Sequence, residues 1–410
     1  MNTKKILVVC DDLTGCGDVA YWGFDSGMRQ KICDLCSLDK TDFAGFEIII
    51  VNTESRFDDR KTADRKLEYI SEWAKTKDFG FIFKKIDSTL RGNFVAEIDV
   101  LIKNFGIKYL PFVAAYPEYG RNTVNGFQYV NDKLLHETEF AKDPKNPVTE
   151  SHIAAMLKKQ SKFFEVYNVY DVETDSDFVG ILKNITFRYE NCDNDQVKVF
   201  AGTAKFFGEI LNANFGSIAC HPVENCHCKS LHFHPAHFFF HPEQGEGSRF
   251  FTSFRMTQQT CDFQNLLVIA GSFNLATKKQ LDNFYYKFSL GKIEENENYV
   301  LASNNKNMYV IESPRQILQD YCLSAMIEKA KELLAKLGLG YEKTLLILTG
   351  GDTAYKFCKS FGIFDIEVIA KIDTGIMLCG DIQKKVCFVL KSGGFGDEEF
   401  LVRIGMKTIL

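Results

Sequence analysis

Short apolar runs alternate along the chain with longer segments in which apolar residues recur every three or four positions. The runs are nearly continuous and rich in β-branched and aromatic residues, as in strands buried on both faces of a sheet. In the first half they are Ile6–Cys10, Phe46–Val51, Phe81–Ile86, Tyr109–Ala115 and Val197–Ala201. Arg60–Lys75 and Phe94–Phe105 have the spacing of amphipathic helices. This alternation predicts an α/β domain with a largely parallel sheet.

The same alternation returns in the second half of the chain. The predicted strands there are Leu266–Ala270, Met308–Ile311, Thr344–Leu348 and Val386–Leu390, and a helix is predicted over Gln316–Leu337. We therefore expect two α/β domains with largely parallel sheets, over residues 1–213 and 264–410, and an active site in the cleft between them. Residues 214–263 are expected to form an interdomain linker or insertion.

This expected linker is rich in histidine and cysteine. Six of the eight histidines lie between His221 and His241, among Cys220, Cys226 and Cys228. One interpretation is a metal site, since these side chains are zinc ligands. The spacing fits no zinc motif and contains no Cys-x2-Cys pair, so we favour an exposed insertion and predict no bound metal.

Composition narrows the class of protein. The 410 residues carry a formal charge of -5 with no block of lysine or arginine, which disfavours a nucleic-acid partner. No window approaches the length of apolar sequence that a membrane helix needs, and Ile6–Cys10 is too short for a signal peptide. The thirteen scattered cysteines suit a reducing compartment. We expect a cytoplasmic protein that acts on small molecules, and leave open whether it forms a homodimer.

Polar and glycine residues concentrate just after four predicted strands, where ligands bind in open α/β sheets. The first group is Asp11–Asp18, which includes Asp12, Thr14 and two glycines. Paired carboxylates at a strand end can accept hydrogen bonds from hydroxyls, act as a base or hold a metal. Capping of the next helix is the alternative, although one carboxylate would be enough for it.

The second group, Lys84–Asn93, contains three cations, a carboxylate, two hydroxyls and an amide. A polyhydroxylated substrate with a carboxylate requires such a mixture, because arginine and lysine pair with the carboxylate and the other groups bind hydroxyls. Arg56 lies at a further strand end, after Phe46–Val51. A solvated charged turn is the alternative interpretation of the Lys84–Asn93 segment.

The third and fourth groups, Thr349–Ala354 and Lys391–Asp397, are rich in glycine. Glycine lets the backbone approach a phosphate closely, and the helix expected after Gly351 would offer its amino-terminal N–H groups. Taken alone, Gly393–Gly396 could be a simple turn. The chain has no Walker motif, which disfavours a P-loop kinase.

Together these segments resemble the four-carbon acid sugar kinase family. The segments that carry the resemblance are Asp11–Gly15, Lys84–Asn93, Tyr116–Arg121, Gly126, Tyr129–Asn131, His136–Ser151, Thr349–Ala354 and Lys391–Asp397. The similarity covers both expected domains, and His136–Ser151 is its most specific part. It implies a sugar-acid-binding amino-terminal domain and a nucleotide-binding carboxy-terminal domain, with ATP as phosphoryl donor and Mg2+ brought with ATP.

The resemblance also implies roles for individual residues. The substrate-binding residues it implies are Asp12, Arg56, Lys85, Ile86, Asp87, Ser88 and Arg91. The ATP-binding residues it implies are Ser272, Gly350, Gly351, Asp352, Thr353, Gly393, Gly394, Phe395 and Gly396. We expect Asp12, or otherwise Asp11, to orient or deprotonate the attacking hydroxyl, with Asp397 as a further candidate for the base. The expected product is a four-carbon acid, such as threonate, erythronate or 3-oxo-tetronate, phosphorylated at its terminal 4-hydroxyl.

The chain departs from the family pattern in two places. Gly202–Phe207 replaces a Gly-Ser-Ala-Gly-Leu-Ala sequence, and the histidine-rich segment lengthens the expected linker. A sugar-acid-binding protein that has lost catalysis is therefore one alternative function. A dinucleotide-dependent dehydrogenase is a second, disfavoured because Gly15 and Gly17 lack the third glycine of that fingerprint.

Overall fold

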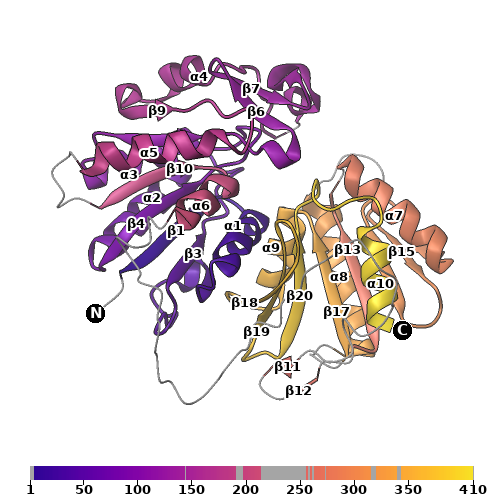
Figure 1. Ribbon diagram of the computed structural model, residues 1–410. Helices are drawn as coiled ribbons and strands as arrows, with labels where there is room; N and C mark the ends of the chain where they lie inside the picture. The colour runs from indigo at the N-terminus through magenta and orange to yellow at the C-terminus, as the bar shows by residue number, and fades with distance from the viewer. Residues whose placement is uncertain are drawn as a thin grey trace.

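The computed structural model describes most of the chain in two halves joined by a common sheet (Figure 1). The described residues are 4–143, 145–190, 197–213, 255–256, 259–260, 263–272, 274–314, 320–338 and 343–409. The histidine-rich segment and nearly all of the expected linker lie outside these ranges. The expectation about a metal there concerns residues that the structure does not describe.

The amino-terminal half contains seven parallel strands. In spatial order they are β2 (Gln30–Asp34), β3 (Ile48–Asn52), β1 (Lys5–Cys10), β4 (Phe79–Lys85), β10 (Lys198–Gly202), β5 (Leu110–Val113) and β9 (Tyr167–Val169). Helices α1 (Leu13–Asp25), α5 (Asp177–Glu190) and α6 (Ala204–Asn212) cover one face. Helices α2 (Arg60–Lys75), α3 (Phe94–Phe105) and α4 (Ile153–Gln160) pack on the other.

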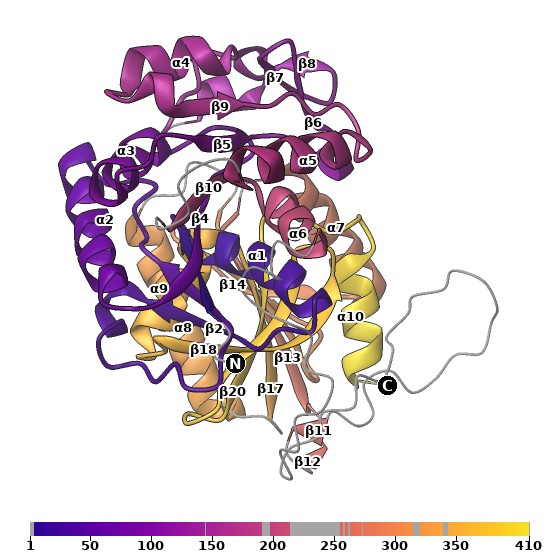
Figure 2. The same cartoon turned by 60° about the vertical axis from the view of Figure 1, so that its left-hand side comes forward.

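A small antiparallel sheet is attached to this half. It consists of β6 (Arg121–Val124), β7 (Phe127–Val130) and β8 (Lys133–Leu134), followed by a short 3-10 helix over Glu139–Lys142. Figure 2 shows it beside α4 and β9. The sheet is built from Arg121–Leu134, so the chain leaves and re-enters the main sheet between β5 and β9.

The carboxy-terminal half is a mixed sheet. Its strands, in spatial order, are β14 (Gly291–Glu295), β15 (Val300–Ser303), β16 (Met308–Glu312), β13 (Asn265–Ala270), β17 (Thr344–Thr349), β20 (Val386–Lys391), β19 (Ile376–Asp381) and β18 (Asp365–Asp373). The four central strands, from β16 to β20, are parallel, and the outer pairs are antiparallel. Helices α7 (Leu275–Phe288) and α10 (Phe400–Ile409) cover one face, and α8 (Asp320–Leu337) and α9 (Gly351–Ser360) cover the other.

The predicted α/β fold is confirmed, with an addition that the sequence did not predict. Strand β18 pairs antiparallel with β2, so Asp365 lies opposite Cys33 and Glu367 opposite Lys31. The two expected sheets therefore form one sheet of 15 strands. A separate two-stranded ribbon contains β11 (Arg255–Met256) and β12 (Gln259–Thr260).

Helix α1 lies between the two halves of the sheet. Every residue from Leu13 to Gly23 is buried, because the helix contacts β1 and β3 of one half and β18, β19, β20 and α9 of the other. One apolar core accordingly contains Val19 of α1, Ile50 of β3 and Leu390 of β20. Figure 1 shows this helix between the two halves, where it packs against strands of both.

Candidate active site

Two carboxylates and one guanidinium form the centre of the site, at the end of β1. Arg56 donates from Nε and Nη2 to Asp11, at 2.8 and 2.9 Å, and from Nη1 and Nη2 to Asp12, at 3.1 and 2.9 Å. Asp11 and Asp12 are buried. Burial alone would raise the pKa of Asp11, but Arg56 outweighs it and holds that pKa below its usual value. The three side chains therefore form a buried, charge-assisted cluster.

Asp12 also begins helix α1. Its Oδ1 accepts from the backbone N–H of Gly15 at 2.9 Å, and its Oδ2 accepts from the Thr14 hydroxyl at 2.7 Å. Helix capping was the alternative to a chemical role for Asp12 in the sequence, and the structure shows that Asp12 does cap α1. Because both oxygens accept from Arg56 as well, the Asp12 carboxylate is fixed in position.

Gly92 brings the Lys84–Asn93 segment against this cluster. Its φ of +90° is a conformation that side chains rarely adopt, and a Cβ there would lie 3.2 Å from both Asp11 Oδ2 and Arg56 Cγ. Asn93 donates to the carbonyls of Ser55 and Asp58, at 2.9 and 2.8 Å, which ties the same segment to the chain around Arg56.

The two lysines of this segment have different environments because successive side chains of a strand point to opposite faces. Lys84 is fully buried and pairs with Glu97 of α3 at 3.0 Å, so its role is structural. Lys85 faces the other way, where its Nζ lies 3.9 Å from Asp18 Oδ2 and donates to the carbonyl of Ile86 at 3.0 Å. Of the two, Lys85 faces the candidate site.

Asp18 is a buried carboxyl whose role the sequence did not predict. Burial, opposed by Lys85, raises the pKa of Asp18 to about 7. Tyr116 donates to Asp18 Oδ1 at 3.3 Å. A side chain at Gly375, in the turn between β18 and β19, would contact the same oxygen at 2.9 Å. Asp18 thus lies where the two halves meet.

The remaining residues of the predicted sugar-acid group have mixed environments. Asp87 accepts from Arg91 Nε and from Thr89, both at 2.6 Å. Burial would raise the pKa of Asp87, but Arg91 and Arg56 hold it far below its usual range. Arg91 also donates to Asp143 at 3.1 Å. The Ile86 side chain is in the apolar core, so Ile86 can offer a ligand only its backbone. The Ser88 carbonyl accepts from Gln128 at 2.9 Å.

The predicted nucleotide-binding glycines converge on Ser272, just after β13. A Cβ at Gly350 would lie 3.3 Å from Ser272 Cβ, and a Cβ at Gly393 would overlap Ser272 Oγ. Gly350 also has a φ of +99° and precedes α9. The Thr353 hydroxyl lies against Gly271 in the same way. The structure therefore brings the two glycine motifs together with Ser272, leaving no room for side chains between them.

Side chains of α7 and β20 hold the Gly393–Gly396 loop in position. Gln280 donates to the carbonyls of Phe395, Gly396 and Asp397 at 3.1, 2.9 and 2.9 Å, and Thr277 donates to that of Gly393 at 2.7 Å. Lys391 is fully buried beside Thr349, and burial lowers the pKa of Lys391 to about 7. Gln280 and Thr277 gave no signal in the sequence, because they lie inside a helix.

The two groups of residues meet at one point. A Cβ at Gly351, the first residue of α9, would lie 2.7 Å from Asp12 Oδ2 and 3.3 Å from the Thr14 hydroxyl. Next to it, Asp352 pairs with Lys145 of the amino-terminal half at 3.0 Å. Asn146 donates to the Arg56 carbonyl at 3.0 Å. The chain around Lys145 therefore contacts both motif groups.

Asp397 is arranged differently from the other predicted catalytic residues. Its carboxylate accepts from Arg403 Nη1 at 2.7 and 2.9 Å and from the backbone N–H of Glu399 at 2.9 Å, at the start of α10. Its side chain is 63% exposed. These contacts favour a structural role and rank Asp397 below Asp12 as the group that orients a hydroxyl.

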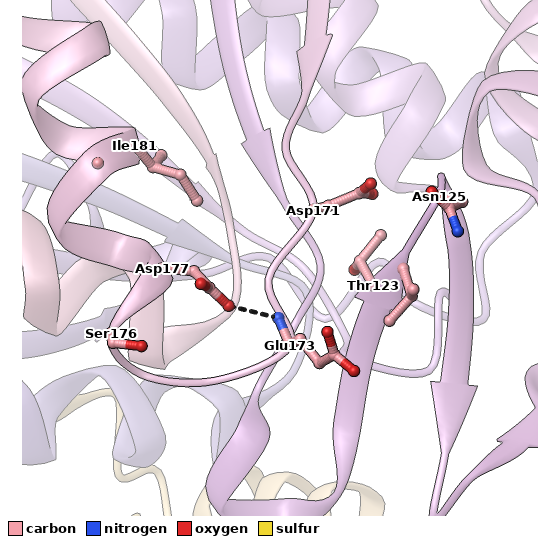
Figure 3. A pocket seen from close by; sticks show the side chains of 9 residues that line it. Thr123, Asn125, Asp171, Glu173, Ser176, Asp177 and Ile181 are labelled. Atoms are coloured by element: carbon pink, nitrogen blue, oxygen red, sulfur yellow. Dashed lines mark hydrogen bonds between the residues drawn. The ribbon is translucent and has the colours of Figure 1, made fainter.

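A cavity of about 610 Å³ lies elsewhere, between β6 and the start of α5 (Figure 3). Its acidic residues brace turns: Asp177 accepts from the N–H groups of Glu173 and Thr174 at 2.9 and 2.8 Å, and Asp171 accepts from that of Gly126 at 2.9 Å. It has none of the converging cations and glycines of the site above, so we do not take it as the active site.

The described residues contain neither a cluster of metal ligands nor a membrane-spanning helix. In that part of the chain, no three histidine, cysteine, aspartate or glutamate side chains are grouped to hold a metal ion. Over the same residues, no helix combines the length and the apolar character needed to cross a membrane.

Each half of the chain matches a family model, and together the two models define the class of protein. Residues 6–188 match the family model described as a sugar-binding N-terminal domain. Residues 289–401 match the model described as a nucleotide-binding C-terminal domain. The chain belongs to the four-carbon acid sugar kinase family.

Curated relatives support this membership. The chain is 35% identical over 167 residues to a D-threonate kinase of Salmonella typhimurium and 32% identical over 161 residues to a D-erythronate kinase of Heliobacterium modesticaldum. These matches span 40% and 39% of this chain, but only 39% and 37% of those relatives. A 3-oxo-tetronate kinase of Haemophilus influenzae is 22% identical, over 96% of this chain and 97% of its own.

Solved structures share the fold. A crystal structure from Salmonella typhimurium LT2 superposes with a TM-score of 0.69 at 17% identity, over 98% of this chain and 99% of the other. Haemophilus influenzae protein HI1011 superposes with a TM-score of 0.64 at 18% identity, over 98% of this chain and all of the other. At these identities the likeness is one of fold.

Proposed function

We propose that this protein is an ATP-dependent kinase that phosphorylates a four-carbon sugar acid at its terminal 4-hydroxyl. The candidate substrates are threonate, erythronate and 3-oxo-tetronate, the acids named in the relatives. In this proposal residues 1–213 bind the sugar acid and residues 264–410 bind ATP, with residues 214–263 as the linker. The cytoplasmic location and the question of a homodimer stay predictions from the sequence.

One observation carries the proposal: Gly351 of the nucleotide-side motif lies directly against the Asp12 carboxylate of the sugar-side motif. A kinase must hold the terminal phosphate of its donor within bonding distance of the acceptor hydroxyl. The first turn of α9, which has no side-chain cap at Gly350, presents its N–H groups for phosphate at the place where Asp12 and Thr14 offer hydrogen-bonding groups for a hydroxyl.

The residues on the nucleotide side fit a polyphosphate. Backbone alone faces Ser272 at Gly350 and Gly393, which is the geometry that a close phosphate contact needs. Gln280 and Thr277 hold the loop carbonyls from the opposite side, so the loop is formed before ATP arrives. Mg2+ would enter with ATP and neutralise phosphate charge.

On the sugar side, the cations proposed to anchor the acid are Arg56, Lys85 and Arg91. Each already pairs with at least one carboxylate, so the substrate carboxylate would share these cations with Asp11, Asp18 and Asp87. Asp12 has oxygens that are hydrogen-bonded throughout. That favours its acting as an orienting group over a strong base, which suffices because phosphoryl transfer depends mainly on positioning.

The test is steady-state turnover of ATP against a panel of four-carbon acids, with phosphorylated product identified by mass spectrometry. ADP and a 4-phosphorylated acid formed in equal amounts support the proposal. Binding of an acid without turnover would instead support a sugar-acid-binding protein that has lost catalysis. Dinucleotide reduction with no ADP would support the dehydrogenase alternative.

A further inference from the structure

The tip of the glycine loop is held by the opposite half of the protein. The ring of Phe395 stacks on Tyr119, which follows β5, with centroids 4.3 Å apart and planes 12° apart. Tyr116 meets the same ring edge-on at 6.4 Å. On the carboxy-terminal side the ring lies against Gly375, whose φ is +65°. A side chain at Gly375 would overlap the ring, so only glycine leaves room for it.

Tyr119 is itself fixed on several sides. Its hydroxyl donates to the carbonyl of Thr374 at 2.9 Å, in the turn between β18 and β19. Tyr116 packs edge-on against it at 4.8 Å, and the Arg121 guanidinium lies 5.8 Å from its ring centre. Because Tyr119 contacts Phe395 on one side and Tyr116 and Thr374 on the others, it can transmit a shift of the Phe395 ring to those residues.

The contacts continue from the aromatic rings into the predicted sugar-acid site. Tyr116 donates to Asp18, and Asp18 lies 3.9 Å from the Lys85 ammonium. Phe395, Tyr119, Tyr116, Asp18 and Lys85 thus form an unbroken series of contacts from the glycine loop to the sugar-side lysine, which we call the aromatic bridge. The loop is held to its own half by Gln280, through its backbone, and to the other half by the Phe395 ring.

We infer that the aromatic bridge couples the two binding events, so that a nucleotide bound at the glycine loop tightens the binding of the sugar acid, with Tyr119 as a positioning residue. The inference rests on the proposed function. Binding at Gly394 and Gly396 sets the position of the Phe395 ring between them, and the stacked pair passes that position to Tyr116 and Asp18. By linkage, the acid tightens nucleotide binding by the same factor.

The experiment is isothermal titration calorimetry of D-threonate and D-erythronate, each with and without a non-hydrolysable ATP analogue. We expect the analogue to tighten acid binding by about fivefold or more in the wild type, the lower range of coupling between sites. Tyr119→Leu removes the stack and should lower that factor by about twofold or more, toward one, since one aromatic pair supplies about 0.5–1.5 kcal/mol. Tyr119→Phe keeps the stack and should keep the factor.

Two further variants keep the test decisive. Phe361→Leu breaks a stacked pair of similar geometry, Phe357 and Phe361 at 4.4 Å, away from the loop, and should leave the factor unchanged. The double variant, Tyr119→Leu with Phe395→Leu, should lower the coupling factor no further than Tyr119→Leu alone. Thermal melts check that each variant folds. A wild-type factor of one, or a factor retained in Tyr119→Leu, overturns the inference while leaving the kinase proposal intact. Wild-type protein that binds neither ligand overturns both.

Discussion

Lys145 extends from the amino-terminal half to the first turn of α9, where its ammonium lies 3.0 Å from the Asp352 carboxylate. The amino end of a helix repels a cation unless an anion is present there. Asp352 supplies that anion in the structure, and the phosphates of ATP would supply another. The pair therefore places a partly exposed lysine beside the expected phosphate site.

Lys145→Ala should raise the KM for ATP by about fivefold or more, since a charge-assisted contact is lost, yet change stability by less than about 1 kcal/mol. The small stability effect follows from side-chain exposures of 40% and 29% for Lys145 and Asp352. Asp352→Asn is the matched control: it removes the partner and keeps the cation, so its KM should rise less. Equal increases of KM in both variants would mean that Lys145 acts through its ion pair with Asp352 and does not contact ATP itself. Steady-state kinetics and urea unfolding provide the two measurements.

Asp12→Asn should keep the fold and lower turnover about a hundredfold or more, because an amide cannot hold a hydroxyl for attack as a carboxylate does. Asparagine is also a good helix cap, so α1 should still begin at the same residue. Circular dichroism and kcat measure the two effects. Unchanged turnover in a folded variant would remove Asp12 from the mechanism and bring Asp397 back into consideration.

Arg56→Ala should destabilise the protein as well as weaken sugar-acid binding. The sequence alone assigned Arg56 only to substrate binding. In the structure the substitution would leave Asp11 and Asp12 buried without their cation, a change that costs about 3 kcal/mol or more. Chemical unfolding measures the loss, and Arg60→Ala, at an exposed arginine on α2, serves as the control. A variant as stable as the wild type would show that another cation replaces Arg56.

Asp18 should make stability depend on pH. Its pKa is about 7 in the folded protein against an ordinary 3.8, so the unfolded chain loses this proton first as pH rises. The contribution of Asp18 to the free energy of unfolding is therefore largest below about pH 4, declines up to about pH 7 and is constant above. The free energy of unfolding in urea is measured for the wild type and for Asp18→Asn between pH 5 and 8. The difference between the two should show this decline. Asp25→Asn, at a more exposed position on the same helix, should have the same dependence of unfolding free energy on pH as the wild type. If Asp18→Asn also showed the wild-type dependence, the prediction would be contradicted.

Amphipathic periodicity predicted some elements of the fold to the residue. Helices α2 and α3 begin and end as expected, because their apolar faces are regular. Strands β2, β18 and β19 were not predicted. In β2 only Ile32 and Cys33 are apolar, and β18 is partly exposed along most of its length. These strands form the junction, so the sequence predicted two sheets where the structure has one.

The candidate site was predictable in its location and less so in its contacts. Strand-end reasoning found Asp12, Arg56 and Lys85, which the structure places close together. The sequence could not predict that Arg56 donates to Asp11 and Asp12, because this depends on how the segment after β3 lies against the segment after β1. Gln280 carried no signal, and Tyr119 entered only as part of the Tyr116–Arg121 resemblance, since the importance of both comes from contacts with residues far away in sequence.

The pairing of β2 with β18 has a consequence for how the chain is made. Strand β2 is an outer strand of the amino-terminal sheet until Asp365–Glu367 arrives beside it. At about 5–20 residues per second, a ribosome needs on the order of tens of seconds to pass from one strand to the other. During that time the nascent amino-terminal half has an open sheet edge, the kind of surface that pairs with neighbouring chains. A fragment that ends at residue 213 would keep that edge permanently, and should self-associate through it more readily than the full chain does.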